Sequence, residues 1–219
     1  MFRRTLFALA AAAAVLVIPQ PAEAHGFSST VYADVHESGP QVKTKLELEY
    51  DLLVVSAADA EKDDPLFRAG TAAFEAGDTK GQGAALDAHA ATVLKYVEKR
   101  FTLANCTARQ DGKFVMGERE GVPYAGMNLT WSCGKGSGHE VSSALFGDGE
   151  GYVKNVRTLV TYDLDGRSGS ATLDSAQPSL STGRPWYAIW WVWTPLPVLV
   201  ALLVVVIMRR RRSHVRELG

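Results

Sequence analysis

A histidine at the start of a mature chain could offer a metal ion two nitrogen ligands at once. Ala22 and Ala24 form the small-x-small pattern of a signal-peptide cleavage site, so cleavage after Ala24 would make His25 the first residue. His25 would then carry a free α-amine beside its imidazole, and adjacent nitrogens of this kind chelate Cu(II) or Ni(II). The alternative interpretation is that His25 merely follows the cleavage site.

A complete metal site needs further ligands, and three other histidines lie in the same part of the chain. If residues 28–36 form one strand, His36 is about 30 Å from His25, which excludes it. His89 falls in a segment with helical spacing, where we expect it to be packed or exposed. His139 follows a glycine-rich turn and could approach His25. The candidate metal ligands are therefore His25 and His139, with Cu or Ni as the candidate cofactor.

Cys106 and Cys133 are the only cysteines of the chain. An even number of cysteines in a chain routed to an oxidising compartment predicts a disulfide. The alternative, a thiolate metal site, lacks the second nearby cysteine of a C-x-x-C pair. We therefore predict a Cys106–Cys133 disulfide.

Catalytic signatures are missing from the sequence. It contains no G-x-S-x-G, no H-E-x-x-H and no paired-cysteine redox motif. Residues 163–166 (DLDG) lack the remaining ligands of a calcium loop, so we interpret them as a turn. Residues 147–151 (GDGEG) lack the lysine of a phosphate-binding loop, which leaves a flexible acidic loop. We therefore expect a protein that is not an enzyme.

Two terminal segments predict the location of the protein. Residues 1–24 combine two arginines, an apolar run and the cleavage site, and are typical of a secretory signal peptide. Residues 186–208 combine tryptophans with a long uncharged stretch, and residues 209–219 begin with four arginines. Interfacial aromatics on one side and clustered arginines on the other predict a single transmembrane helix with a basic cytoplasmic tail. We therefore expect a single-pass protein of the cytoplasmic membrane with its N-terminal domain outside.

Charge is distributed unevenly along the chain. The part between His25 and Pro185 contains 16 Lys and Arg against 22 Asp and Glu, a net charge of −6, whereas the two ends are basic. An acidic domain without a basic stripe argues against nucleic acid as a partner. The expected partners are the membrane and another protein.

Period-two patterns predict strands in the expected extracytoplasmic domain. Apolar residues alternate with polar ones over 31–35 and 46–54, with turn chemistry at 37–40 between them. Residues 65–76 and 82–100 are instead rich in Ala, Leu, Glu and Lys, and predict two helices. Asp63 or Asp64, before Pro65, is a suitable N-cap for the first helix.

Strand patterns return after Phe101 and continue to Leu173. Strands on both sides of a short helical insertion, mostly in hairpins, predict a mainly β fold, namely an antiparallel β-sandwich with a two-helix insertion. We assign residues 25–175 to this domain and residues 176–185, rich in Ser and Pro, to a linker.

Several short motifs carry a family resemblance. The stretch from Asn105-Cys106 to Cys133, with the VSSALF segment 141–146 and ATLD at 171–174, resembles the extracytoplasmic N-terminal domain of HupE/UreJ-like bacterial membrane proteins. Such domains also begin Ala-His after signal cleavage, and they carry a helix before the first cysteine. The likeness covers most of residues 25–175. Among candidate ligands only His25 matches by place.

HupE/UreJ-like proteins usually continue into several membrane helices associated with nickel or other transition metals, whereas we expect one such helix here. The resemblance therefore implies sensing, delivery or partner docking rather than transport. Our leading expectation is a membrane-anchored extracytoplasmic domain that binds an unidentified ligand or protein. The alternatives are transition-metal binding or delivery through His25, and a structural role in the assembly of a membrane complex.

Overall fold

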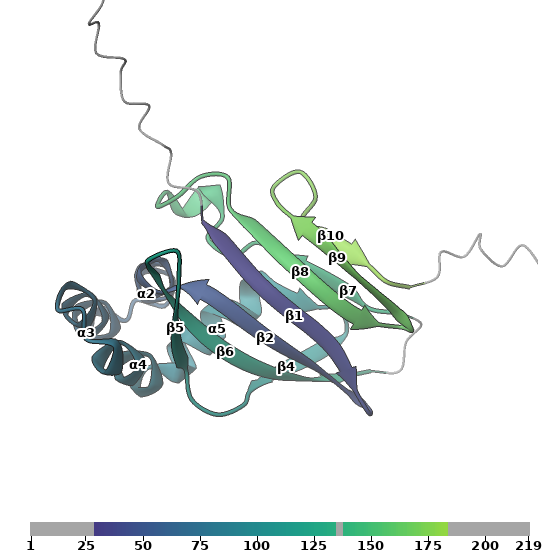
Figure 1. Cartoon of the computed structure of the whole chain (residues 1–219), viewed down its shortest axis with the longest axis horizontal. Helices are drawn as coiled ribbons and strands as arrows, with labels where there is room; N and C mark the ends of the chain where they lie inside the picture. The colour runs from purple at the N-terminus through teal and green to yellow at the C-terminus, as the bar shows by residue number, and fades with distance from the viewer. Residues whose placement is uncertain (1–28, 135–137, 184–219) are drawn as a thin grey trace, which may run out of the picture.

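The computed structural model describes residues 29–134 and 138–183, which form two β-sheets and a group of helices (Figure 1). The strands of the larger sheet are β1 (Thr30–Ser38), β2 (Gln41–Glu49), β4 (Cys106–Gln110), β5 (Val115–Arg119), β6 (Val122–Cys133), β8 (Arg157–Leu164) and β9 (Arg167–Leu173). They lie in the order β4-β6-β2-β1-β8-β9, and β5 also pairs with β6. The strands of the smaller sheet are β3 (Phe101–Leu103), β7 (Glu140–Ser143) and β10 (Ser179–Ser181), in the order β10-β7-β3.

Alternation of apolar and polar residues builds the β1–β2 hairpin at the centre of the large sheet. Val31, Ala33 and Val35 of β1 are buried, whereas Asp34 and His36, which alternate with them, are exposed. Side chains of one strand point alternately to opposite faces, so this pattern gives the sheet an inner apolar face and an outer polar face. The predicted strand over 31–35 is confirmed, and the mainly β character of the fold with it.

The predicted antiparallel arrangement holds for the other strand pairs of the described residues, but β1 and β8 run parallel, so the larger sheet is mixed. Thr30 pairs with Arg157 and His36 with Asp163. Parallel neighbours need a long crossover, and here the connection contains β2, the four helices of the described residues and strands β3 to β7. No short turn connects β1 to β8, so the local sequence does not reveal that they pair.

The helical part of the described residues contains four helices, not the predicted two. They are α2 (Tyr50–Glu61), α3 (Asp64–Glu75), α4 (Thr79–Ala88) and α5 (Ala90–Arg100). α2 starts where the alternating pattern predicts that a strand continues to Val54. Most of its residues are buried, including Leu52, Leu53 and Val54, so its apolar pattern does not mark one face. Asp63 caps α3 as predicted, accepting a hydrogen bond from the Leu66 amide at 3.0 Å.

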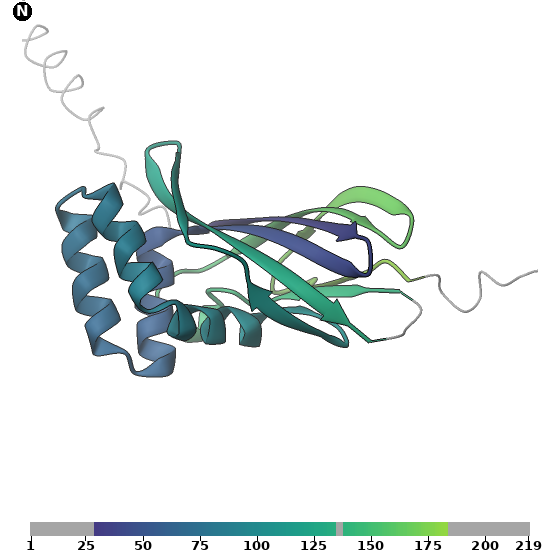
Figure 2. The same ribbon diagram turned by 90° about the horizontal axis from the view of Figure 1, so that it is seen from below.

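The core lies against the inner face of the large sheet. Figure 2 shows α5 and the small sheet on one side of the large sheet. The rings of Phe101 in β3 and Trp131 in β6 lie 6.2 Å apart across this interface. The indole N–H of Trp131 donates a hydrogen bond of 2.9 Å to the Thr44 hydroxyl, so its one polar atom is satisfied in the interior. The outer face of the sheet carries no second layer in the part of the chain that the structure describes.

The acidic loop after β7 is held by a buried tyrosine. It contains a short 3-10 helix, η1 (Asp148–Glu150). The Tyr96 hydroxyl donates to the Glu150 carboxylate at 3.1 Å and accepts from the Phe146 amide at 3.1 Å. Arg100 pairs with Glu150 at 2.6 Å and stacks over the Tyr96 ring. Burial, followed by the charge of Glu150, raises the pKa of Tyr96 above its ordinary value. The predicted flexible loop is therefore anchored at Glu150.

Gly70 of α3 lies so close to α2 that a side chain at this position would not fit between the two helices. A Cβ placed there would lie 2.6 Å from Val54 Cγ1. We expect Gly70→Ala to lower the free energy of unfolding by about 1–3 kcal/mol, because Val54 must shift within a packed core. Urea unfolding of the purified chain measures this. Gly117→Ala is the control, since no atom lies within 4 Å of a Cβ added there. Equal stability of the two variants would contradict the close approach of the helices.

The predicted linker over 176–185 is wrong for its middle part. Ser179–Ser181 form β10, which pairs with β7, and Thr182 is buried. Residues up to Thr182 therefore belong to the fold. Within the described ranges, no helix is long and apolar enough to span a membrane. The predicted signal peptide, transmembrane segment 186–208 and tail 209–219 lie outside the described residues.

Candidate functional site

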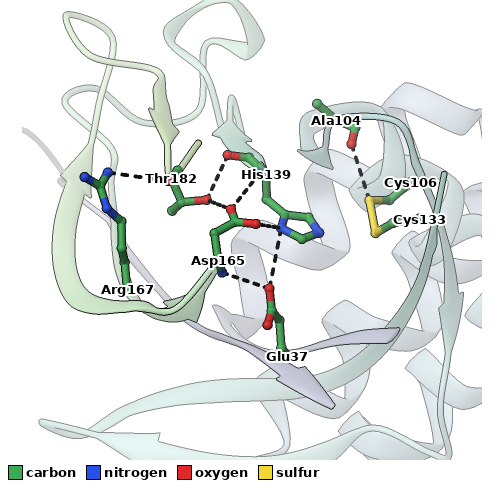
Figure 3. Close-up of polar contacts among 8 residues, drawn as sticks. All are labelled: Glu37, Ala104, Cys106, Cys133, His139, Asp165, Arg167 and Thr182. Carbon is green, nitrogen blue, oxygen red and sulfur yellow. Dashed lines mark hydrogen bonds and ion pairs between the residues drawn. A yellow bond between two sulfur atoms is a disulfide. The ribbon is translucent and has the colours of Figure 1, made fainter. Parts of the chain in front are cut away.

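The predicted disulfide is confirmed. Cys106 in β4 and Cys133 at the end of β6 are directly paired in the sheet, and their sulfur atoms are bonded. Figure 3 also draws the 3.3 Å approach of Cys106 Sγ to the Ala104 carbonyl oxygen. This is a contact and not a hydrogen bond, because a disulfide sulfur carries no proton.

His139 points into a polar cluster at one end of the large sheet (Figure 3). Its Nδ1 atom lies 3.1 Å from Asp165 Oδ1 and 3.8 Å from Glu37 Oε1. His139 precedes β7, Asp165 lies in the β8–β9 turn and Glu37 lies near the end of β1. The fold therefore brings together three side chains that are remote in sequence, and we call them the Glu37–His139–Asp165 cluster.

Asp165 is the most firmly oriented member of the cluster. Its Oδ2 atom accepts hydrogen bonds from the Thr182 hydroxyl and from the His139 backbone amide. Its own amide donates to Glu37 Oε1 at 2.8 Å. Burial alone would raise the pKa of the Asp165 carboxyl, but the hydrogen bonds from Thr182 and His139 outweigh it and hold that pKa below its ordinary value. Asp165 is therefore ionised and fixed in orientation at neutral pH.

The disulfide lies on the other side of the His139 ring (Figure 3). Metal ligation by cysteine needs a thiolate, and both sulfur atoms here are used in the S–S bond. Cys106 and Cys133 therefore lie beside the cluster but contribute no ligands to it.

The other two histidines of the described residues, His36 and His89, are not part of this cluster. His36 is exposed on the outer face of the large sheet, 4.0 Å from Asp34. His89 lies at the junction of α4 and α5, where its Nδ1 atom is 2.9 Å from Asp63 Oδ2. Thr92 donates to the same oxygen at 2.6 Å, so His89 helps to fasten the start of α3 to α5.

His25 lies outside the described residues. The predicted pairing of His25 with His139 as metal ligands therefore stays a prediction.

A broad concavity of about 630 Å³ lies on the outer face of the large sheet. Its floor comes from β1 and β2, and its walls include Arg119 at the end of β5 and Leu159 of β8. Figure 2 shows the β5–β6 hairpin projecting beyond the sheet. The hairpin thus turns an otherwise open sheet face into a groove.

Charged and aromatic side chains contact one another along the wall of this concavity. Arg119 Nε donates to Glu47 Oε2 at 2.7 Å, and Lys45 Nζ lies 2.7 Å from Glu47 Oε1. Hydrogen bonds from Lys45 and Arg119 hold the pKa of Glu47 below its ordinary value, although partial burial opposes them. The guanidinium of Arg119 also lies 3.9 Å from the centre of the Tyr32 ring. Tyr124, which is buried and does not line the concavity, meets Tyr32 edge to face, with ring centres 5.9 Å apart.

Comparison with known proteins does not assign this chain to a family. No family model matches this chain, and no curated protein matches it. The likeness to HupE/UreJ-like domains therefore stays an expectation from short motifs.

Sequence reasoning identifies His139 as a candidate ligand but does not identify Glu37, Asp165 or Arg119. Glu37 and Asp165 belong to segments whose strongest signals are those of turns, and the turn interpretation of Asp165-Gly166 is correct: both residues have positive φ between β8 and β9. Arg119 follows no recognisable motif. Only the parallel pairing of β1 with β8 brings Glu37 beside the Asp165 turn, and no local pattern reports that pairing.

Proposed function

We propose that this chain is a membrane-anchored extracytoplasmic domain that docks a protein partner in the concavity on the outer face of its large sheet. The proposed role is binding and not catalysis. The anchor is the predicted segment 186–208, and the signal peptide predicted over 1–24 accounts for the proposed location outside the cytoplasmic membrane. The partner is a protein of the same compartment or membrane.

The character of the concavity favours a protein over a small molecule. Pockets for small molecules are enclosed and lined mostly by apolar side chains. This one is open and lined by Asp34, Lys45, Glu47 and Arg119, with hydroxyls from β8 and β9. Protein interfaces are about as polar as the remaining surface, with Tyr and Arg enriched at their centres. The lining therefore matches a protein-docking surface.

The observation that carries the proposal is the prearranged pair of Arg119 and Tyr32 in the concavity, supported by the buried Tyr124. Tyr and Arg are the side chains most often found to dominate binding energy at interfaces. Here the stacking of Arg119 on Tyr32 and the edge-to-face contact of Tyr32 with Tyr124 restrict their rotamers before any partner arrives. Little conformational entropy is then lost on binding.

Charge indicates what the partner presents to this wall. Lys45 and Arg119 share the single carboxylate of Glu47, and no other acidic side chain of the described residues forms an ion pair with either. Lys45, Glu47 and Arg119 together carry one net positive charge, and Asp34 of the same lining offsets it over the concavity as a whole. A partner that places a carboxylate beside Arg119 would complement the basic side of this lining, and complementary charges both speed association and favour the correct partner.

Site-specific photo-crosslinking of the full chain in its own membrane tests the proposal. A photoreactive amino acid at Thr172, inside the concavity, should crosslink a defined partner segment that contains an acidic residue. The same group at exposed Ala76 after α3 should not. Arg119→Glu should lower the yield at Thr172 by about tenfold or more, because reversing a buried or central interface charge costs more than about 1.4 kcal/mol.

Lys80→Glu is the matched control for Arg119→Glu, because it reverses an exposed charge on α4 at a distance from the concavity. It should leave the crosslink at Thr172 unchanged. Equal crosslinking from Thr172 and Ala76, or a yield that does not respond to Arg119→Glu in a folded variant, would overturn the proposed docking surface.

A further inference from the structure

We infer that the Glu37–His139–Asp165 cluster is a binding site for a divalent transition-metal ion with nitrogen and oxygen ligands, Zn²⁺ being the ion that suits it best. This inference is independent of the proposed docking surface. Glu37 pairs with Val42 and so lies on the inner-face side of β1, whereas the concavity opens on the outer face.

The separations of the three side chains fit coordination to one ion. A tetrahedral site with bonds of 2.0–2.1 Å places its ligand atoms about 3.3 Å apart. His139 Nδ1 lies 3.1 Å from Asp165 Oδ1 and 3.8 Å from Glu37 Oε1, and all three ligand atoms lie within 4.8 Å of one another. The observed separations bracket the tetrahedral value, so coordination needs only small side-chain movements.

The surroundings orient the ligands as in a metal site. Hydrogen bonds to the second oxygen of a ligating carboxylate hold it in place and are a common part of such sites. Asp165 Oδ2 is occupied by the Thr182 hydroxyl and the His139 amide, which leaves Oδ1 directed at the imidazole. The Asp165 amide donates at 2.8 Å to Glu37 Oε1, the same oxygen that lies 3.8 Å from His139 Nδ1, and so fixes the ligand atom itself. Glu37 and Asp165 are thus positioned before an ion binds.

The identity of the ligands selects the class of ion. One imidazole with two carboxylates suits Zn²⁺ and its neighbours among the transition metals, whereas Ca²⁺ and Mg²⁺ prefer oxygen ligands throughout. Three protein ligands leave a fourth position for water. The His139 side chain is 19% exposed and that of Glu37 44%, so an ion has access from solvent.

Binding at Nδ1 has a proton balance that can be measured. In the absence of metal, the contact between His139 Nδ1 and Asp165 Oδ1 places a proton between them. Coordination through Nδ1 requires a neutral ring that carries its proton on Nε2. Metal binding therefore either moves this proton to Nε2 or, from the doubly protonated ring, releases one proton to buffer.

The test is titration of the purified full chain in detergent with Zn²⁺ alone, by calorimetry at neutral pH. We expect one ion per chain, and a loss of affinity of about tenfold or more in His139→Gln, Asp165→Asn and Glu37→Gln, the range seen when metal-site groups are removed. His36→Gln is the matched control, because His36 lies one residue from Glu37 but on the opposite face. Its affinity for Zn²⁺ should equal that of the unchanged chain.

Asp165→Asn also replaces the carboxylate that accepts hydrogen bonds from Thr182 and the His139 amide, which could unfold this end of the domain, so Glu37→Gln is the deciding variant. A version with one additional alanine before a processed His25 separates this site from one at the amino terminus. Affinity that survives the added alanine and falls in Glu37→Gln supports the inference. Absence of Zn²⁺ binding, which would leave the cluster as an ion pair with a protonated imidazole, would overturn it. So would affinity that falls with the added alanine but not in Glu37→Gln.

Discussion

Replacing Cys106 and Cys133 together by serine should lower the free energy of unfolding by about 3.5 kcal/mol. The disulfide closes a loop with a sequence separation of 27 residues, and in the chain-entropy model a loop of this length restricts the unfolded chain by that amount. The folded state should change little, because β4 stays hydrogen-bonded to β6 through residues such as Thr107 and Arg109. Urea unfolding of the oxidised chain and of the double variant measures the difference.

The unchanged chain under reducing conditions is the control for this experiment. It should match the double-serine variant in the urea concentration at the midpoint, because both lack only the cross-link. The free energies of unfolding of the oxidised and reduced chains could instead differ by less than about 1 kcal/mol. That result would show that residual structure already restricts this loop in the unfolded state without the disulfide.

Tyr96→Phe should lower the free energy of unfolding by about 2–3 kcal/mol. Tyr96 is fully buried, and its hydroxyl serves the Phe146 amide as acceptor and the Glu150 carboxylate as donor. Phenylalanine leaves the buried amide without its partner, and an unsatisfied buried group costs about 1–3 kcal/mol. The ring remains, so the stacking of Arg100 is kept and the experiment isolates the hydroxyl.

A double-mutant cycle with Glu150→Gln identifies the partners in this network. We expect the two single effects to be non-additive by about 1 kcal/mol, because both variants remove parts of one hydrogen-bonded group. Tyr152→Phe removes a hydroxyl from a tyrosine that is 39% exposed, and should change stability by less than about 0.5 kcal/mol. Equal effects of Tyr96→Phe and Tyr152→Phe would contradict the network.

Local patterns predict the strands well where one face is buried. Val31, Ala33 and Val35 face the core and their neighbours face solvent, and this alternation is visible in the sequence. The same reasoning fails at Leu52 and Val54, because α2 is covered on most sides and its helical period is hidden. The cap at Asp63 succeeds because it depends on neighbouring residues only.

The candidate sites depend on contacts between distant segments, and their prediction is correspondingly incomplete. The disulfide is predictable because the chain has two cysteines and a predicted export signal. His139 is identified as a candidate ligand, but the sequence pairs it with His25 rather than with Glu37 and Asp165. The parallel register of β1 and β8 and the turn after β8 decide that neighbourhood, and neither leaves a local signal.

The pairing of β1 with β8 also bears on the order in which the chain gains its structure. β1 has its antiparallel partner β2 at once, but its other edge waits for residues 157–163. The helices between them make contacts close in sequence, whereas this pairing has a high contact order and should be slow to form. Until β8 emerges, the second edge of β1 is open to strands of other chains. We therefore expect this protein to be most prone to aggregate during synthesis and export, while this edge of β1 is still unpaired.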